Sequence, residues 1–214
     1  MEKWGCNMEI DITKIPVYWI TIETAIDRHD RMNEIFEKFN FKNTIQINGE
    51  LAEKNEKTFM QIQQEKSHLV AEAHSKALLN PGPILILEDD VWYTENFNPI
   101  VNVPDDTDAV YLGTSIWGMK DGISQGGGTR FRPINEDFVK PYGMLGVHSI
   151  LYLSESYKKK TIDLMLSAKE NGMFMDEPIA INMENENILC YSYPRFYQKD
   201  GHNDQVTSIP LVIQ

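Results

Sequence analysis

Three consecutive acidic residues, Glu88, Asp89 and Asp90, directly follow a run of branched aliphatic residues at Ile84 to Leu87. An apolar run of this length, preceded by a turn of prolines and glycine at 81–83, predicts a strand buried on both faces of a sheet. The carboxyl end of such a strand is where ligands bind in open α/β sheets. Neighbouring carboxylates repel one another, and hard cations such as Mg²⁺ or Mn²⁺ bind oxygen ligands and complete their shells with water and substrate phosphates. The triplet therefore predicts a divalent cation site, and the alternative is a set of acids that cap the next segment and face water.

The spacing of the three acids predicts a division of their roles. Two side chains separated by one residue point the same way from an extended backbone, so Glu88 and Asp90 are expected to face the ligand. The carboxylate of Asp89 is then expected to point toward the interior and to be held by the protein.

A second pair of acids, Asp176 and Glu177, opens a short predicted helix that has Pro178 in its first turn. A carboxylate brought close to the first acids is suited to take the proton from an acceptor hydroxyl, as general-base catalysis requires. The alternative is that both acids only interact favourably with the positive end of the helix dipole.

Three histidines and two arginines complete the set of candidate residues. His202 lies in a polar tail that can fold back over a ligand, and a neutral imidazole binds manganese or zinc; the alternative is a surface histidine without a role. His68 and His74 are six residues apart on one predicted helix, so they do not form a metal-binding pair. Arg28 and Arg31 begin the first predicted helix, where they either clamp phosphates or lie on a solvated helix face.

The elements that position these residues follow from the periodicity of apolar residues. Strands are predicted at 15–22 and 44–47 with an amphipathic helix at 27–39 between them, and a long helix at 58–79 leads into the central strand. Further strands are predicted at 109–113, 142–153 and 188–191, and a further helix at 157–169 with Ser154 as its N-cap. This order predicts the α/β class, with a mixed, mostly parallel central sheet flanked by helices and with mixed strand directions in the second half.

The remaining segments are predicted to be irregular. Residues 1–14 form a polar lead-in, 98–108 a connection rich in proline and aspartate, and 194–205 an irregular tail. The segment 114–132 contains five glycines and is predicted to be a mobile loop, either a lid or disordered.

Composition limits the class of protein and its partners. The chain has 214 residues, is expected to form a single domain over 1–214, and carries a formal net charge of −12, which argues against binding to nucleic acid. Two distant cysteines, the lack of a secretory h-region and the lack of an apolar span predict a cytoplasmic protein without a transmembrane segment.

Several of these patterns together resemble glycosyltransferase family 25, which includes lipopolysaccharide and collagen galactosyltransferases. The matching pieces are Asp27-Arg28 with Arg31 and Met32, Ser67-His68, Leu87-Glu88-Asp89-Asp90-Val91, the strand from Gly146 to Leu153, and Pro194 with Gln198 ahead of Asn203-Asp204. The resemblance implies a GT-A fold, a UDP-sugar donor, a manganese-type cofactor and β-linked transfer with inversion at the anomeric carbon. The glycine-rich segment 114–132 matches no motif of the family.

The resemblance also assigns roles to individual residues. It implies metal binding by Glu88, Asp90 and His202, and catalysis by Asp176 or Glu177. The residues implied in nucleotide binding are Thr21, Arg28, Arg31, Ser67, Glu88 and Asp89.

The sequence thus favours a metal-dependent glycosyltransferase that moves a hexose, galactose first, from a UDP-sugar to a hydroxyl of a glycan or another acceptor. One alternative is a nucleotide-binding or sugar-binding protein without catalysis. Another is a metal-dependent phosphohydrolase, although phosphatases of the haloacid dehalogenase type require a nucleophilic aspartate where Glu88 stands.

Overall fold

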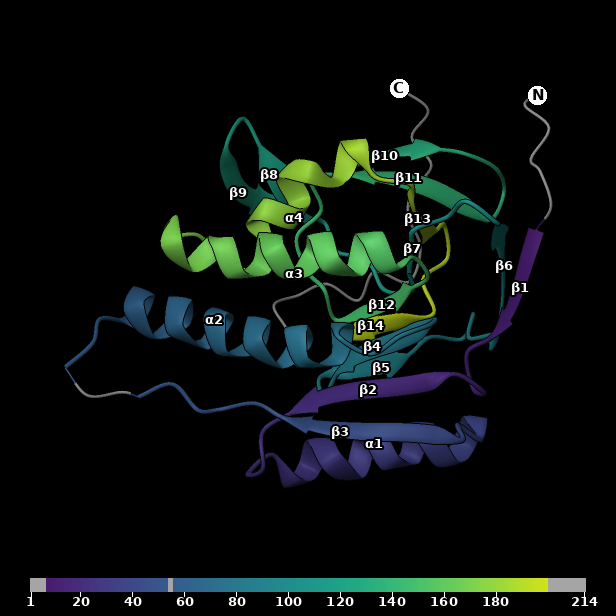
Figure 1. Cartoon of the computed structure of the whole chain (residues 1–214), viewed down its shortest axis with the longest axis horizontal. Coiled ribbons are helices and arrows are strands. Elements are labelled where there is room, and N and C mark those ends of the chain that lie inside the picture. Colours follow the sequence, from purple (N-terminus) through teal and green to yellow (C-terminus); the bar gives the residue numbers. More distant parts are fainter. Residues whose placement is uncertain (1–6, 54–55, 200–214) are drawn as a thin grey trace.

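The computed structural model describes residues 7–53 and 56–199, and within this part the core is an eight-stranded sheet in the order β10-β11-β13-β7-β12-β4-β2-β3 (Figure 1). Its strands are β2 (Pro16–Thr21), β3 (Asn43–Asn48), β4 (Ile84–Glu88), β7 (Ala109–Tyr111), β10 (Arg130–Pro133), β11 (Phe138–Tyr142), β12 (Ser149–Tyr152) and β13 (Ile188–Tyr191). The helices are α1 (Ile26–Phe39), α2 (Phe59–Leu78), α3 (Glu155–Glu170) and α4 (Glu177–Asn182), and a 3₁₀ turn follows at Met183–Asn185.

The strand directions confirm the predicted α/β class with a mixed, mostly parallel sheet. Strands β2, β3 and β4 are parallel, while β12 is antiparallel to both of its neighbours, β4 and β7. Strand β13 is parallel to β7, β11 is antiparallel to β13, and β10 is antiparallel to β11. Among the described strands of this sheet, β11 and β12 therefore run against the other six, and both belong to the second half of the chain.

The central strand β4 is buried on both faces, as its uninterrupted apolar run predicts. Ile84 and Ile86 pack with residues of α2 and α3 on one face, while Leu85 and Leu87 pack with residues of α1 and of the N-terminal segment on the other. All four side chains are fully buried. Because side chains alternate between the faces of a strand, Glu88 continues the row toward α2 and Asp89 the row toward α1.

The helix positions agree with the predictions to within two residues at each end. The hydroxyl of Thr58 and the side chain of Gln61 form a capping box at the start of α2, and Ser154 accepts a hydrogen bond from the backbone N–H of Tyr157 at the start of α3. No helix within 7–53 and 56–199 combines the length and the apolarity needed to cross a membrane.

Two segments that were predicted to be irregular form a small sheet instead. Within the expected lead-in, β1 (Asn7–Asp11) pairs in antiparallel fashion with β6 (Ile100–Pro104), which lies in the expected connection at 98–108. The prediction was wrong because the apolar residues that this sheet contributes to the core, such as Ile10 and Val103, are spread among polar ones.

The glycine-rich segment 114–132 is also not an irregular loop. It contains the antiparallel hairpin of β8 (Trp117–Lys120) and β9 (Ile123–Gly126), followed by β10. A Cβ on Gly118 would lie 2.3 Å from the backbone nitrogen of Thr129, so glycine serves close packing of backbones here.

Two further strand boundaries differ from the predictions. Of the strand expected at 142–153, only β12 at its second half forms, and Tyr142 is the last residue of β11. Gly143 and Gly146 adopt positive φ angles of 66° and 105° in the turn between the two strands. The described part of the expected irregular tail contains β14 (Phe196–Gln198), which pairs with β5 (Val91–Tyr93) directly after the acids.

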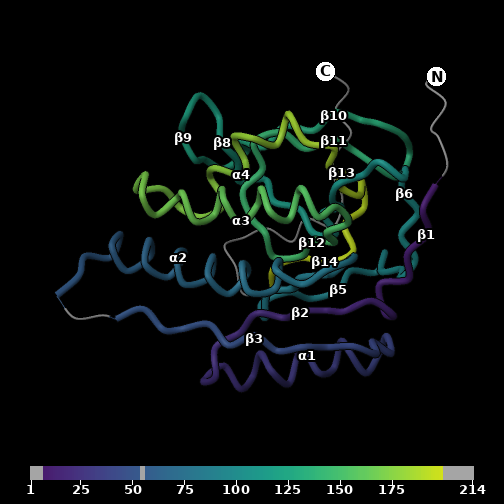
Figure 2. The backbone as a smooth tube through the Cα atoms, in the orientation of Figure 1, coloured from purple at the N-terminus to yellow at the C-terminus, as the bar shows by residue number. Residues whose placement is uncertain are grey.

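The arrangement brings several connections to one edge of the main sheet. The chain leaves β2 for α1 and β3 for α2 at the left of the molecule, and the β8–β9 hairpin projects toward the same side (Figures 1 and 2). The carboxyl end of β4 reaches this edge beside β2, with which it is in parallel register.

Candidate functional site

Asp89 is held by two neighbouring elements. Its Oδ2 accepts a hydrogen bond from the hydroxyl of Thr21 at 2.6 Å, and its Oδ1 accepts one from Nη1 of Arg28 at 2.7 Å. Its backbone N–H also donates to the carbonyl oxygen of Ile20. Asp89 is buried and connects β4 to β2 and α1, so the prediction that the protein holds this carboxylate is confirmed.

Glu88 lies on the opposite face, against helix α2. Nε2 of the fully buried His74 is 3.1 Å from Oε1 of Glu88. Burial raises the pKa of Glu88, but the hydrogen bond and charge of His74 together with the charge of Arg28 outweigh it, and the pKa is lowered. Glu88 is therefore an ionised carboxylate that is fixed from the helix side.

A second buried histidine lies beside Glu88 on the neighbouring strand. The backbone N–H of Glu88 donates to the carbonyl of His148, and burial lowers the pKa of His148 to about 4, so its ring is neutral at neutral pH. A Cβ on Gly113 would lie 2.1 Å from Nε2 of this ring. Glycine at position 113 is thus needed for His148 to occupy its place.

Asp90 is the one acid of the triplet with a buried carboxylate oxygen that lacks a partner in the described part of the chain. Its Oδ2 accepts a hydrogen bond from Nε2 of Gln198 at 3.2 Å, whereas its buried Oδ1 accepts none from any described residue. Burial, followed by the negative charge of Glu88, raises the pKa of Asp90 to about 7. A cation bound beside Asp90 would stabilise the ionised carboxylate and so offset both the effect of burial and the repulsion by Glu88.

Asp176 approaches the same acids from the second half of the chain. Its Oδ2 accepts a hydrogen bond from the backbone N–H of Gly146 at 2.9 Å. Burial raises the pKa of Asp176 to about 6, and the charge of Glu88 contributes to this rise. Glu177 has a different role, because its side chain accepts a hydrogen bond from the backbone N–H of Phe174 and closes the local turn. Of the two predicted candidates, Asp176 is the one whose pKa is raised by burial and by the charge of Glu88.

The segment that delivers Asp176 is anchored to one side of α2. Gln64 donates to the carbonyl of Gly172, and a ring nitrogen of His68 lies 3.2 Å from the carbonyl of Met173. The hydroxyl of Ser67 accepts a hydrogen bond from the backbone N–H of Met175. In the structure Ser67 therefore positions the segment before Asp176, and its predicted contact with a nucleotide stays a prediction. His68 and His74 have different partners, the carbonyl of Met173 and the carboxylate of Glu88.

A hollow of about 410 Å³ lies at the start of α1, on the side of the acids that Arg28 occupies. Its lining residues are Thr24, Ala25, Ile26, Asp27, Arg28 and Arg31. The guanidinium of Arg28 lines this hollow while it bonds Asp89, so the hollow and the acid triplet share one residue. Both predicted phosphate-binding arginines are thus on its wall.

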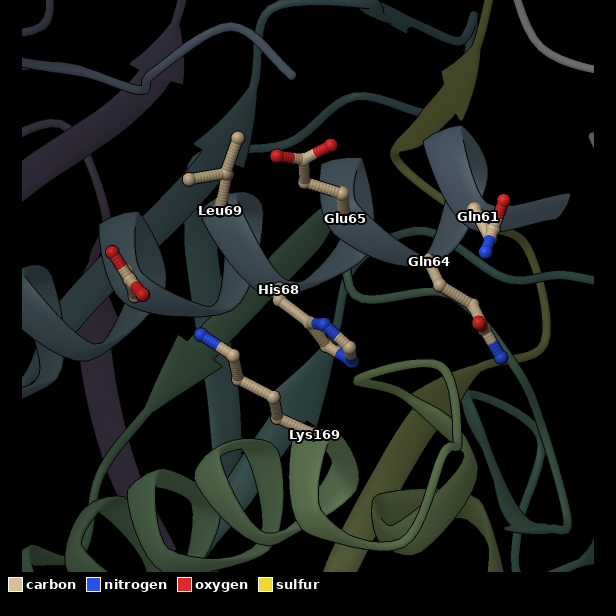
Figure 3. A pocket seen from close by; sticks show the side chains of 7 residues that line it. Gln61, Gln64, Glu65, His68, Leu69 and Lys169 are labelled. Carbon is tan, nitrogen blue, oxygen red and sulfur yellow. The ribbon is translucent and has the colours of Figure 1, made fainter. Parts of the chain in front are cut away.

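A second hollow of about 360 Å³ lies between α2 and α3 (Figure 3). His68 points from α2 toward α3, and Lys169 reaches from α3 toward α2. None of its lining residues belongs to the predicted site, and two of them, Gln64 and His68, already bind the backbone at 172–173. This hollow therefore lies where α2 holds the backbone that precedes Asp176.

The residues of the site fit a divalent cation that takes much of its shell from a substrate. Within 7–53 and 56–199, no group of three or more histidine, cysteine or acidic side chains is placed to hold a metal by itself. Magnesium and manganese sites often use only one or two carboxylates together with substrate phosphates and water. The Oδ1 of Asp90, beside the charge of Glu88, meets that need. The third predicted ligand, His202, lies outside the described residues.

Sequence reasoning missed the roles of His74 and His148. A signal existed for His74, because it lies midway between Val70 and Leu78 in a row of residues four apart, which places it on the buried side of α2. No comparable signal marks His148, which precedes the apolar strand β12 and lies beside Glu88 only through the pairing of β12 with β4.

Comparisons with known proteins give similarity to solved structures alone, since no family model and no curated protein matches the chain. A glycosyltransferase involved in the glycosylation of the major capsid of PBCV-1 is 10% identical, with a TM-score of 0.46 over 89% of this chain and 94% of that one. A nucleoside-diphosphate-sugar pyrophosphorylase from Vibrio cholerae is 10% identical, with a TM-score of 0.42 over 84% and 73%. A CTP:phosphocholine cytidylyltransferase from Streptococcus pneumoniae is 9% identical, with a TM-score of 0.38 over 86% and 93%. None of these TM-scores reaches 0.5, so the function proposed below rests on the residues of this chain.

Proposed function

We propose that this chain is a metal-dependent glycosyltransferase that moves a hexose from a nucleotide-sugar to a hydroxyl acceptor. The observation that carries the proposal is that Asp90 and Asp176, which come from different halves of the chain, both lie near Glu88 at the end of β4, where burial and then the charge of Glu88 raise their pKa values. One acid has the features of a cation ligand and the other those of a general base. UDP as the nucleotide, galactose as the first sugar to test and inversion of the anomeric carbon follow from the resemblance to glycosyltransferase family 25.

The hollow at the start of α1 is the proposed place of the nucleotide diphosphate. Arg28 keeps 40% of its side chain exposed while it bonds Asp89, so it can also contact a phosphate. Asp90 and Glu88 are the residues that would hold Mn²⁺ or Mg²⁺, which when bound neutralises charge on the departing diphosphate. The hydrogen bond between Arg28 and Asp89 fixes the position of the proposed phosphate-binding arginine relative to the acids that would hold the cation.

Asp176 is the proposed general base. With a pKa of about 6, its carboxylate is mostly ionised at neutral pH and still basic enough to accept the proton of a hydroxyl. The Gly146 hydrogen bond fixes its orientation. The acceptor oxygen then attacks the anomeric carbon as the bond to the diphosphate breaks, through a state with oxocarbenium character.

A calorimetric titration with UDP tests the donor side. The wild-type protein is expected to bind UDP more tightly with Mn²⁺ than with EDTA, and Asp90→Asn is expected to lose that difference. Asp163→Asn, an exposed substitution on α3, is the matched control and is expected to bind as the wild type does. Equal affinities of wild type and Asp90→Asn in the presence of Mn²⁺ would remove Asp90 from the site.

A donor-hydrolysis screen separates an enzyme from a binding protein. With Mn²⁺ and a set of UDP-sugars, slow release of UDP from one of them is expected, because water can replace a missing acceptor. Binding of UDP without turnover of any UDP-sugar would favour a non-catalytic nucleotide-binding protein and would contradict the transferase.

A further inference from the structure

The β8–β9 hairpin, residues 117–126, is attached by its main chain to the loop that holds the proposed base. The N–H of Met119 donates to the carbonyl of Gly143 at 2.7 Å, and the N–H of Leu145 donates to the carbonyl of Trp117 at 2.9 Å. The residue after Leu145 is Gly146, whose N–H binds Asp176. The hairpin and the base therefore share one short backbone segment, 143–146.

Glycines allow the backbone of the hairpin to lie close to the backbone of the loop at 143–146. A Cβ on Gly118 would lie 2.7 Å from the carbonyl oxygen of Gly143, and a Cβ on Gly143 would lie 2.7 Å from the carbonyl oxygen of Met119. Real Cβ atoms do not approach backbone atoms so closely, so each glycine is needed for the two backbones to lie side by side. Helix α4, which follows Asp176, also packs against β8 (Figure 1). The hairpin is thus placed at a defined position relative to Asp176.

Trp117 presents an indole ring on this hairpin. It lies opposite Gly126 in the register of β8 and β9, and a Cβ on Gly126 would be 3.9 Å from two atoms of the ring. One part of the ring therefore covers the glycine backbone, while 42% of the residue is exposed to solvent. An aromatic ring packed across the strand from a glycine on one side and open to solvent on the other is a ready surface for a flat, partly apolar ligand.

A hydroxyl group lies at the start of the hairpin, next to the loop that binds the base. The Oγ of Ser115 accepts a hydrogen bond from the N–H of Trp117 at 3.0 Å. The Cβ of the same serine is 3.6 Å from the position that a Cβ of Gly146 would take. Ser115 is therefore next to the loop that binds Asp176, and it adds a polar group beside the aromatic surface.

The charge of this region favours a neutral ligand. Residues 114–128 contain one cation, Lys120, and one anion, Asp121, in a chain whose net charge is −12. Both lie at the turn of the hairpin, away from Trp117. An indole face with neighbouring hydroxyl and backbone groups and no net charge suits a neutral sugar ring, whose C–H face is apolar and whose edge carries hydroxyls.

We propose that the acceptor site lies at the Trp117–Gly126 end of the β8–β9 hairpin, away from the turn that carries Lys120, and that a neutral glycan binds there by stacking a sugar ring on Trp117. This inference rests on the proposed glycosyltransferase function and names the acceptor class. Trp117 is a specificity-determining residue in it, because it orients the acceptor hydroxyl toward Asp176.

The test is an array of immobilised neutral oligosaccharides, probed with the full-length protein in the presence of UDP and Mn²⁺. We expect saturable binding to at least one glycan, about tenfold weaker binding by Trp117→Ala, and binding within about threefold of wild type by Trp117→Phe, which keeps an aromatic face. Lys120→Ala, an exposed change in the same hairpin, is the matched control and is expected to bind normally. Melting temperatures of all variants identify any loss of folding.

Two results would overturn the proposal. One is the absence of any neutral glycan whose binding depends on Trp117. The other is a lower molar mass of Trp117→Ala in light scattering together with unchanged glycan binding, which would assign the hairpin to contacts between copies of the chain.

The array together with the UDP titration separates this inference from the proposed function. Glycan binding that depends on Trp117 in a protein that does not bind UDP would leave the hairpin site standing and remove the transferase. If the protein binds UDP with Mn²⁺ but its glycan binding is unchanged in Trp117→Ala, the hairpin site is removed and the proposed transferase still stands.

Discussion

The two sides of the candidate site are built by different means. On the side of β2, β4 and α1, side chains bind side chains, as in the contacts of Asp89 with Thr21 and Arg28. On the side of the β8–β9 hairpin and α4, backbone groups bind other backbone groups or single side chains, as in the contact of Gly146 with Asp176. We call these the donor side and the acceptor side.

This difference between side-chain and backbone contacts predicts how each side of the site tolerates substitutions. Side-chain contacts can be removed one at a time, each at a moderate cost in stability, because the parallel strands beneath them remain paired. Main-chain contacts that need glycine depend on the absence of a side chain, so one added methyl group displaces a whole segment. Substitutions on the two sides are therefore expected to separate donor binding from transfer.

The largest effect is expected from Asp176→Asn. Loss of a general base lowers the rate of transfer by about 10²–10⁴-fold, whereas affinity for UDP stays within about threefold, because Asp176 belongs to the acceptor side. Initial rates at saturating donor and a UDP titration measure the two quantities. Glu177→Gln is the matched control, since Glu177 closes only the turn at Phe174. A rate loss of equal size in both variants would exclude a specific role for Asp176.

The next effect concerns the fold of the acceptor side. Gly118→Ala places a methyl group 2.3 Å from the backbone nitrogen of Thr129, and we expect it to lower the free energy of unfolding by about 3 kcal/mol. Gly126→Ala is the control, because its Cβ has an ordinary contact distance of 3.9 Å to Trp117. Urea denaturation of both variants measures the difference. Equal stabilities would contradict the role of Gly118 in close packing.

The donor side carries the third prediction. The buried Oδ1 of Asp90 has no partner in the described part of the chain, so its charge destabilises the metal-free protein at pH 8. Asp90→Asn is expected to raise the free energy of unfolding in EDTA by roughly 1–3 kcal/mol and to remove the further stabilisation by Mn²⁺. Thermal melts with EDTA and with Mn²⁺ measure both. A less stable variant in EDTA would show that the carboxylate has a partner.

A smaller change is expected with pH. Burial raises the pKa of Asp176 to about 6, and only its ionised form accepts a proton, so the rate of transfer is expected to rise about tenfold per pH unit below pH 6 and to level off above it. In Asp176→Asn this rise should disappear. A profile of kcat from pH 5 to 8 in both proteins provides the measurement. A rise that persists in the variant would assign the titration to another group.

The smallest effect is expected from Ser67→Ala. It removes the acceptor for the N–H of Met175 and should cost about 1 kcal/mol of stability. If Ser67 only positions the acceptor side, affinity for UDP will not change. A loss of UDP affinity in this variant would instead support the predicted contact of Ser67 with the nucleotide.

Much of the donor side could be predicted from local pattern. The buried strand β4, the acids at its end and the arginines that open α1 are visible because apolar periodicity and helix-start signals act over a few residues. The interior role of Asp89 followed from the alternation of side chains along a strand.

The acceptor side could not be predicted in the same way. Five glycines in 114–132 indicated mobility, but one of them, Gly118, excludes a side chain because its backbone lies close to that of Gly143 in a different segment. The choice between Asp176 and Glu177 was also open, because both suit the first turn of a helix. Only the position of the Gly146 N–H distinguished them.

The sequence by itself determined the α/β class, the central buried strand and the carboxylates that end it, since these depend on hydrophobic pattern and on the charge of neighbouring residues. Only the tertiary structure decided which of those carboxylates are held by other residues and which one keeps a buried oxygen without a partner in the described part of the chain. Gln198 reaches Asp90 across 108 positions, and Ser67 reaches the segment before Asp176 across the same separation. Such contacts arise from the packing of whole elements, which no local pattern encodes.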